Sequence, residues 1–93
     1  MSDVRPIGDE FEQCTPPSMC STEIAFTVFR YKVVRHAEIE GGRTAAVLDP
    51  IDIKKYPVSK WALWLGEFRP VPPPECVELL DEGWQALHRA HWN

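Results

Sequence analysis

The stretch that decides the fold is residues 24–53, which read IAFTVFRYKVVRHAEIEGGRTAAVLDPIDI. Apolar and polar side chains alternate on both sides of Gly41-Gly42, as is typical of strands that bury one face. Two adjacent glycines supply the positive φ angles that a two-residue hairpin turn needs. The stretch therefore predicts a β-hairpin over residues 24–53, with Glu40 opposite Arg43 and Ile39 opposite Thr44.

The first strand of this hairpin changes its apolar face along its length. Phe26 and Val28 share one phase of the alternation, whereas Phe29 and Tyr31 share the other. A slip of one residue turns every later side chain to the opposite face unless the strand bulges. The sequence therefore predicts a bulge between Val28 and Phe29 and a strongly bent sheet, which could be a partly open, SH3-like barrel.

The chain of 93 residues predicts a single domain over 1–93 with one modest core. It has no apolar run close to the ~18 residues that cross a bilayer, and residues 1–9 lack the basic and apolar segments of a signal peptide. We expect a cytoplasmic protein. Residues 1–23 are predicted to form an acidic opening strand, over Ile7 to Gln13, and a proline-rich loop.

The C-terminal part of the chain predicts a helix over residues 74–93. Pro74 suits the first helical position, and one buried stripe follows helical spacing through Cys76, Leu79, Leu80, Gly83, Trp84 and Leu87. Residues 54–73 are a tryptophan-rich segment followed by a polyproline spacer. Within them, Val58 to Phe68 fits either a helix or a strand, and we favour a short helix or turn after Ser59. The predicted fold class is α+β, with a small antiparallel sheet and the helix packed on it.

Cysteine and histidine usage points to no cofactor. The chain has three cysteines, and an odd number argues against a disulfide framework; Cys14 and Cys20 could bridge, but free thiols are favoured in a reducing cytosol. His88 and His91 share a helix face, yet a third metal ligand would have to come from Cys14 or Cys20. No nucleophile turn or glycine-rich phosphate loop is present. We therefore expect no metal, no cofactor and no enzymatic activity.

Charge is distributed in bands along the chain. Residues 1–23 carry five acidic groups and one basic group, for −4; residues 24–60 carry seven basic and four acidic groups, for +3; the remainder carries two basic and five acidic groups, for −3. Such banding can orient a partner and raise the rate of encounter. The first hypothesis is therefore stoichiometric binding to a protein with a basic, nucleic-acid-binding groove. The residues expected to carry it are Glu75, Glu78, Asp81, Glu82 and Trp92.

In its small size, acidity and lack of catalytic motifs, the chain resembles the accessory proteins of phages and mobile elements, such as host-takeover or anti-CRISPR factors. That resemblance implies an inhibitor or modulator of a partner protein. The alternative hypothesis is a nucleic-acid-binding β-sheet, with Phe29 and Tyr31 beside a basic set of Arg30, Lys32, Lys54 and Lys55. The net charge of −4 counts against this alternative.

Overall fold

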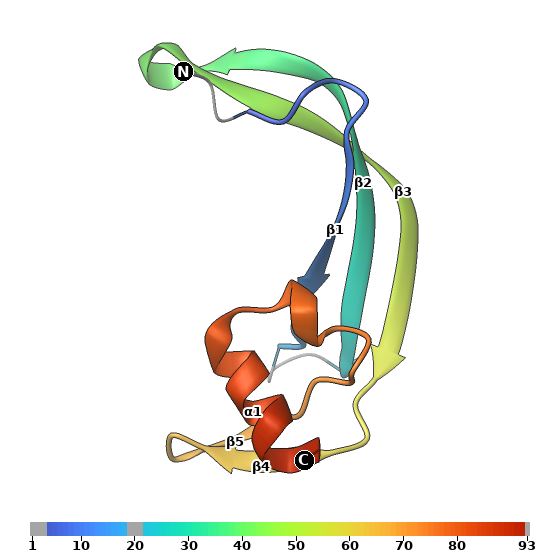
Figure 1. Cartoon of the computed structure of the whole chain (residues 1–93), viewed down its shortest axis with the longest axis vertical. Helices are drawn as coiled ribbons and strands as arrows, with labels where there is room; N and C mark the ends of the chain where they lie inside the picture. The colour runs from blue at the N-terminus through green and yellow to red at the C-terminus, as the bar shows by residue number, and fades with distance from the viewer. Residues whose placement is uncertain (1–3, 19–21, 93) are drawn as a thin grey trace.

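The computed structural model describes residues 4–18 and 22–92. Two long strands, β2 (Ala25–Ile39) and β3 (Arg43–Pro57), form a ribbon, and β1 (Glu10–Thr15) pairs antiparallel with the first half of β2. A small separate hairpin, a 3₁₀ turn and a helix complete the order: β4 (Trp61–Trp64), β5 (Glu67–Pro70), η2 (Val77–Leu79) and α1 (Glu82–Trp92). Figure 1 shows the ribbon curving away from the end that carries α1 and the β4–β5 hairpin. The α+β prediction is confirmed, and the sheet stays open rather than closing into a barrel.

The core lies at one end of the ribbon. One face of β1 and β2 packs against the segment ahead of α1 through five buried residues, Cys14, Phe26, Val28, Cys76 and Leu80. Trp84 of α1 lies edge-on to Phe26, with ring centroids 5.7 Å apart. The buried stripe that the sequence predicted is therefore confirmed for Cys76, Leu80 and Leu87, whereas Leu79 and Trp84 are partly buried and Gly83 is exposed.

The turn of the long hairpin has three residues, not two. The 3₁₀ turn η1 (Glu40–Gly42) places Ile39 opposite Arg43 and Glu38 opposite Thr44, so the predicted pairing of Glu40 with Arg43 is wrong by one residue. Gly41 and Gly42 do adopt positive φ, at 82° and 70°. Glu40 joins the turn, and its carbonyl accepts a hydrogen bond of 3.4 Å from Nε of Arg43.

The predicted bulge between Val28 and Phe29 is also wrong. The register shifts lie further along, where Ile51 is the extra residue on β3 and Val34 the extra residue on β2. The apolar phase changes at Val28 for another reason: Phe26 and Val28 face the core, whereas Val33 is fully buried further up the ribbon, where its backbone bonds to Gly8 and Asp9. Phe26 and Val28 point to one face of β2 and Val33 points to the other, so the buried face changes along the strand without a bulge at Val28.

The opening strand begins later than predicted. β1 runs over Glu10–Thr15, as an edge strand, rather than over Ile7 to Gln13. Gly8 has a φ of 93° and lies in a turn that Asp9 closes by a 3.1 Å backbone bond to Pro6. This turn redirects the chain just before the strand starts.

The tryptophan-rich segment forms strands, so the preferred helix or turn after Ser59 is wrong. Trp64 pairs with Glu67, and the two residues between them, Leu65 and Gly66, have φ values of 50° and 80°. Positive φ at both central positions defines a primed two-residue turn. Trp61 stacks on Phe68 across the hairpin, with ring centroids 5.4 Å apart, so these two aromatic side chains share one face of the two strands.

The C-terminal helix is shorter than predicted. It spans Glu82–Trp92, whereas the segment from Pro74 contains the 3₁₀ turn η2 and an extended Leu80 with φ −109° and ψ 162°. Asp81 begins α1, because its Oδ1 accepts a 3.2 Å hydrogen bond from the backbone N–H of Trp84. Gly83 thus lies in the first turn rather than the helix interior, and it does not approach the sheet. Among the described residues, no helix has the length and apolar character needed to cross a membrane.

Candidate protein-binding surface

An acidic hollow lies between β1 and the 3₁₀ turn η2. Its volume is about 370 Å³, and its walls come from β1, β2 and the segment that precedes α1. We call it the acidic cleft, and its lining consists of Glu10, Phe11, Glu12, Arg30, Glu75, Glu78 and Leu79. It brings together two parts of the chain that are more than sixty positions apart in sequence.

The core contact of two cysteines positions the walls of the cleft. Glu10, Glu12 and Cys14 alternate along β1 and therefore share one face of the strand. Cys14 packs in the core with Cys76, which lies between Glu75 and Glu78 in the sequence. The carboxylates of β1 therefore lie on the same face of the strand as the buried Cys14 thiol. The carboxylates on either side of Cys76 in the sequence line the same hollow.

The cleft has an excess of negative charge. Four glutamates and one arginine line it, for a formal charge of −3. Arg30 pairs with Glu10 at 3.0 Å, with both side chains half exposed. Leu79 adds apolar surface and is partly buried, whereas the ring of Phe11 lies on the other face of β1, 5.7 Å from the ring of Tyr31. The arrangement suits a long cationic side chain, since an aliphatic stem can lie on apolar surface while its charged end meets carboxylates.

The other residues that were predicted to bind a partner lie outside the cleft. Asp81 caps α1, Glu82 lies in the first helical turn, and Trp92 lies at the far end of the helix. Trp92 is 42% exposed, and the ammonium of Lys60 sits 3.5 Å from the centre of its ring. Only Glu75 and Glu78 of the predicted set are brought together.

The sequence-based prediction missed Glu10, Phe11, Glu12 and Leu79. The sequence does indicate, from the alternation of Glu10, Glu12 and Cys14, that these three residues share one face of a strand. Nothing local in the sequence says that this face meets Glu75 and Glu78.

The basic residues of the ribbon are interleaved with carboxylates. The register places Arg30 between Glu12 and Asp52. It places Lys32 in the same way between Glu10 and Asp49. Phe29 and Tyr31, which stack at 5.8 Å, lie on the opposite face, because neighbouring residues of a strand point to opposite sides. Lys54 is exposed on β3. The aromatic and basic residues of the alternative hypothesis therefore do not form one surface.

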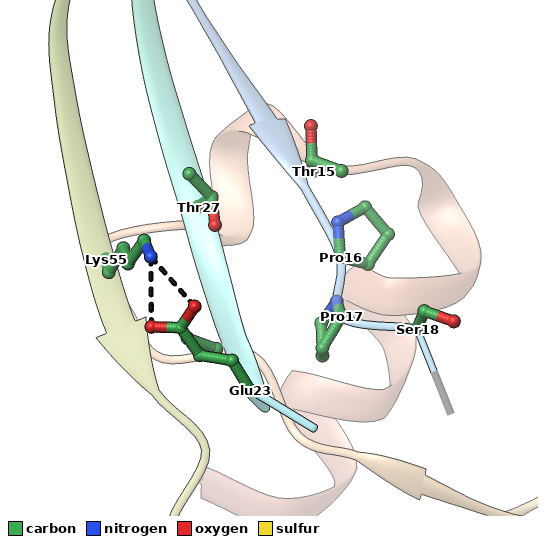
Figure 2. A pocket seen from close by; sticks show the side chains of 8 residues that line it. Thr15, Pro16, Pro17, Ser18, Glu23, Thr27 and Lys55 are labelled. Atoms are coloured by element: carbon green, nitrogen blue, oxygen red, sulfur yellow. Dashed lines mark hydrogen bonds and ion pairs between the residues drawn. The ribbon is translucent and has the colours of Figure 1, made fainter. Parts of the chain in front are cut away.

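A second hollow, of about 280 Å³, lies on the other face of the ribbon beside the loop that follows β1. Figure 2 shows Lys55 reaching Glu23 within it, and Nζ lies 2.9 Å from both carboxylate oxygens. The cation of this hollow is therefore already neutralised by an internal ion pair. Thr15, Thr27 and two prolines supply most of the remaining lining.

Neither described cysteine offers a reactive thiolate. Burial raises the pKa of the Cys76 thiol to about 12, and the neighbouring Cys14 adds to the rise. Burial also raises the pKa of Cys14, against a lowering by its hydrogen bond with Cys76. Both are free thiols, as predicted for Cys14, whereas Cys20 lies outside the described residues. At neutral pH both thiols are protonated, and they serve as small apolar groups of the core.

The fold and the cleft define a class: a small α+β protein with an open, curved sheet and an acidic surface hollow next to its core. Comparison of the chain with protein-family models, with curated proteins and with solved structures gave no match.

Proposed function

We propose that the protein binds a partner protein stoichiometrically through the acidic cleft and thereby inhibits or modulates it. The observation that supports this function is the convergence of four carboxylates from two distant segments beside the apolar side chain of Leu79. A partner that carries lysine or arginine side chains at the rim of a nucleic-acid groove fits this chemistry. The cations that bind phosphate groups in such a groove can also pair with the carboxylates of the cleft. The proposal resembles the action of phage and mobile-element accessory proteins.

The proposed recognition has an electrostatic and an apolar component. Carboxylates at the mouth raise the rate of association with a basic partner, and this contribution weakens with salt. Leu79 can pack against the aliphatic stem of the bound side chain. Arg30 already pairs with Glu10 at 3.0 Å, which leaves Glu12, Glu75 and Glu78 as the carboxylates that can meet a bound cation beside Leu79.

Binding to nucleic acid has less support. Each of Arg30 and Lys32 has carboxylates as cross-strand neighbours, and Lys55 is paired with Glu23. A phosphate backbone would meet these carboxylates as well as the cations, and the resulting repulsion opposes binding. The aromatic residues that would stack on bases lie on the other face of the ribbon.

The test uses two defined probes: a fluorescent arginine-rich peptide and a fluorescent single-stranded oligonucleotide. The decisive variant is E75K/E78K, which reverses two charges inside the cleft. The matched control is E38K/E82K, which reverses two glutamates outside it and so alters the net charge equally. We expect the peptide to bind the wild type with a marked salt dependence, to lose about tenfold or more in affinity for E75K/E78K, and to change little for E38K/E82K.

Two results would contradict the proposal. Equal losses in the two double variants would assign peptide binding to net charge rather than to the cleft. Tighter binding of the oligonucleotide than of the peptide, abolished by R30E/K32E, would favour the nucleic-acid hypothesis instead. Circular dichroism of each variant verifies that the fold is retained.

A further inference from the structure

Strand β3 has an open edge. It pairs with β2 on one side, and among the described residues no strand pairs with its other side over Arg43–Pro57. In Figure 1 its outer side faces away from β1 and β2. An open edge presents unpaired N–H and C=O groups that another strand can bond.

The hydrogen bond of Ile53 reveals which backbone groups point outward. The backbone N–H of Ile53 donates 3.0 Å to Oδ1 of the adjacent Asp52 rather than to the neighbouring strand. In an antiparallel pair, alternate residues direct their N–H and C=O groups toward and away from the partner strand. Ile53 and Lys55 therefore present their backbone groups at the open edge, where the Asp52 carboxylate accepts the N–H of Ile53.

The side chains around this point are apolar and unusually exposed. Ile51 and Ile53 are 47% and 53% exposed, and a shallow hollow of about 340 Å³ is lined by residues Pro50 to Ile53. Ile53 lies opposite Phe29, so the apolar row of the ribbon continues to the very edge of the sheet. The row ends there without a cover from the described residues.

The charges on either side of Ile53 are opposite in sign. Asp52 precedes it and Lys54 follows it. If a second copy of the strand runs antiparallel with Ile53 opposite Ile53, then each Asp52 lies opposite a Lys54 of the other copy. This register also makes the two Ile53 residues a hydrogen-bonded pair, which requires the outward backbone groups described above.

We infer that β3 pairs with β3 of a second copy of this chain, in an antiparallel register about a two-fold axis at Ile53. The pairing joins the two three-stranded sheets into one continuous sheet and extends the row from Phe29 and Ile53 into the same row of the second copy. Edge lysines commonly discourage pairing, but here each Lys54 meets a carboxylate. The inference does not depend on the proposed function, because no residue of β3 lines the acidic cleft.

The choice of a second copy over another protein's strand depends on self-complementarity. A two-fold axis at Ile53 pairs Asp52 with Lys54 twice, once on each side of the axis, and two opposite-charge cross-strand pairs are favourable. A register centred on Asp52 would instead place two carboxylates opposite each other. The segment from Asp52 to Lys54 thus fits itself in one register and is repelled in the neighbouring one.

The test is sedimentation equilibrium of the full chain from low micromolar to millimolar concentration, at low and high salt. We expect a monomer–dimer equilibrium. D52K and K54D alone should each weaken the dimer by about tenfold, since each replaces two attractions by two repulsions. The swapped variant D52K/K54D should recover most of the affinity. The control E38K, on the inner strand, should leave the equilibrium unchanged.

A second variant keeps the test independent of charge. Ile53→Pro removes an outward N–H, and proline is tolerated where the N–H of an edge strand faces solvent, so the monomer should fold while the dimer is lost. In the wild type, hydrogen exchange of the Ile53 and Lys55 amides should slow as concentration rises. A wild type that stays monomeric at all concentrations, or a dimer that D52K, K54D and Ile53→Pro all leave intact, would overturn the inference.

Discussion

Cys14 and Cys76 share a hydrogen bond inside the core and so connect β1 to the segment that leads into α1. Both are buried, at 7% and 0% exposure. Together with the contact of Phe26 with Trp84, their contact links the sheet to the C-terminal part, and it lies beside the two walls of the acidic cleft. Its properties lead to the first prediction.

The stability that Cys76 contributes should fall in alkaline solution. Its pKa is about 12 in the folded protein against 9.0 for an ordinary thiol, so above about pH 9 the unfolded chain loses a proton that the folded chain keeps. Stability from this group is fully present below pH 9 and is lost at up to about 1.4 kcal/mol per pH unit as the pH rises toward 12. The free energy of unfolding in urea should be compared at pH 8, 9 and 10 for wild type and Cys76→Ala. The difference between the two proteins should shrink with pH, and parallel curves would refute the shift.

Leu65→Asn should stabilise the fold. Leu65 holds a φ of 50° in the β4–β5 turn and is 83% exposed, so it bears the cost of a left-handed conformation without burying its side chain. Asparagine accepts this conformation more readily. We expect a gain of about 0.5–1 kcal/mol, measured by thermal or urea unfolding. Leu63→Asn is the control: it is similarly exposed, at 73%, but has no positive φ, and it should not stabilise.

Gly42→Ala should destabilise the long hairpin by roughly 1–2 kcal/mol, because an alanine resists the φ of 70° at this position. The loss is conformational rather than steric, since an added Cβ would meet no heavy atom within 4 Å. Gly83→Ala offers the opposite case, with no positive φ and an ordinary contact of 3.4 Å to Asp81. It should be neutral or stabilising by up to about 1 kcal/mol. Equal melting temperatures for the two variants would show that the turn conformation is not needed.

Asp81→Ala should shorten or weaken α1. The carboxylate accepts the N–H of Trp84 at 3.2 Å, and loss of such a cap costs about 0.5–2 kcal/mol. Asp81→Asn should retain most of the stability, because an amide oxygen can accept the same bond. Helical circular dichroism with urea unfolding checks both variants. A result in which asparagine is as damaging as alanine would assign the effect to charge rather than to capping.

The parts of the fold that sequence predicted well are those with a long local pattern. The ribbon strands extend over 15 residues each, and the apolar spacing of Trp84 and Leu87 lies within the helix. The turn between the strands was wrong by one residue, because two glycines fit a turn of either two or three positions. The β4–β5 hairpin was missed because Trp61, Trp64 and Leu65 match helical spacing in a window too short to distinguish the periods.

The candidate site was only half predictable, for a different reason. Glu75 and Glu78 were predicted from local charge, but the cleft also needs Glu10 and Glu12, which come near them where Cys14 packs with Cys76 in the core. The spacing around Cys14 and around Cys76 assigns each to one face of its own segment, but it does not show that the two residues meet. Asp81 was named for the same charge and instead caps the helix, since a carboxylate ahead of an apolar run serves either role.

The two bulges of the ribbon compensate for each other. Arg30 pairs with Asp52 before them and Arg35 with Val47 after them, so both pairs have position numbers that sum to the same value, although Ile51 and Val34 are each left unpaired between them. One extra residue in each strand restores the register that the other disturbs. The far end of the ribbon therefore has the pairing it would have in an unbroken hairpin. A change in length on either strand can preserve that pairing only when a matching change occurs on the other, so the two strands are constrained to vary in length together.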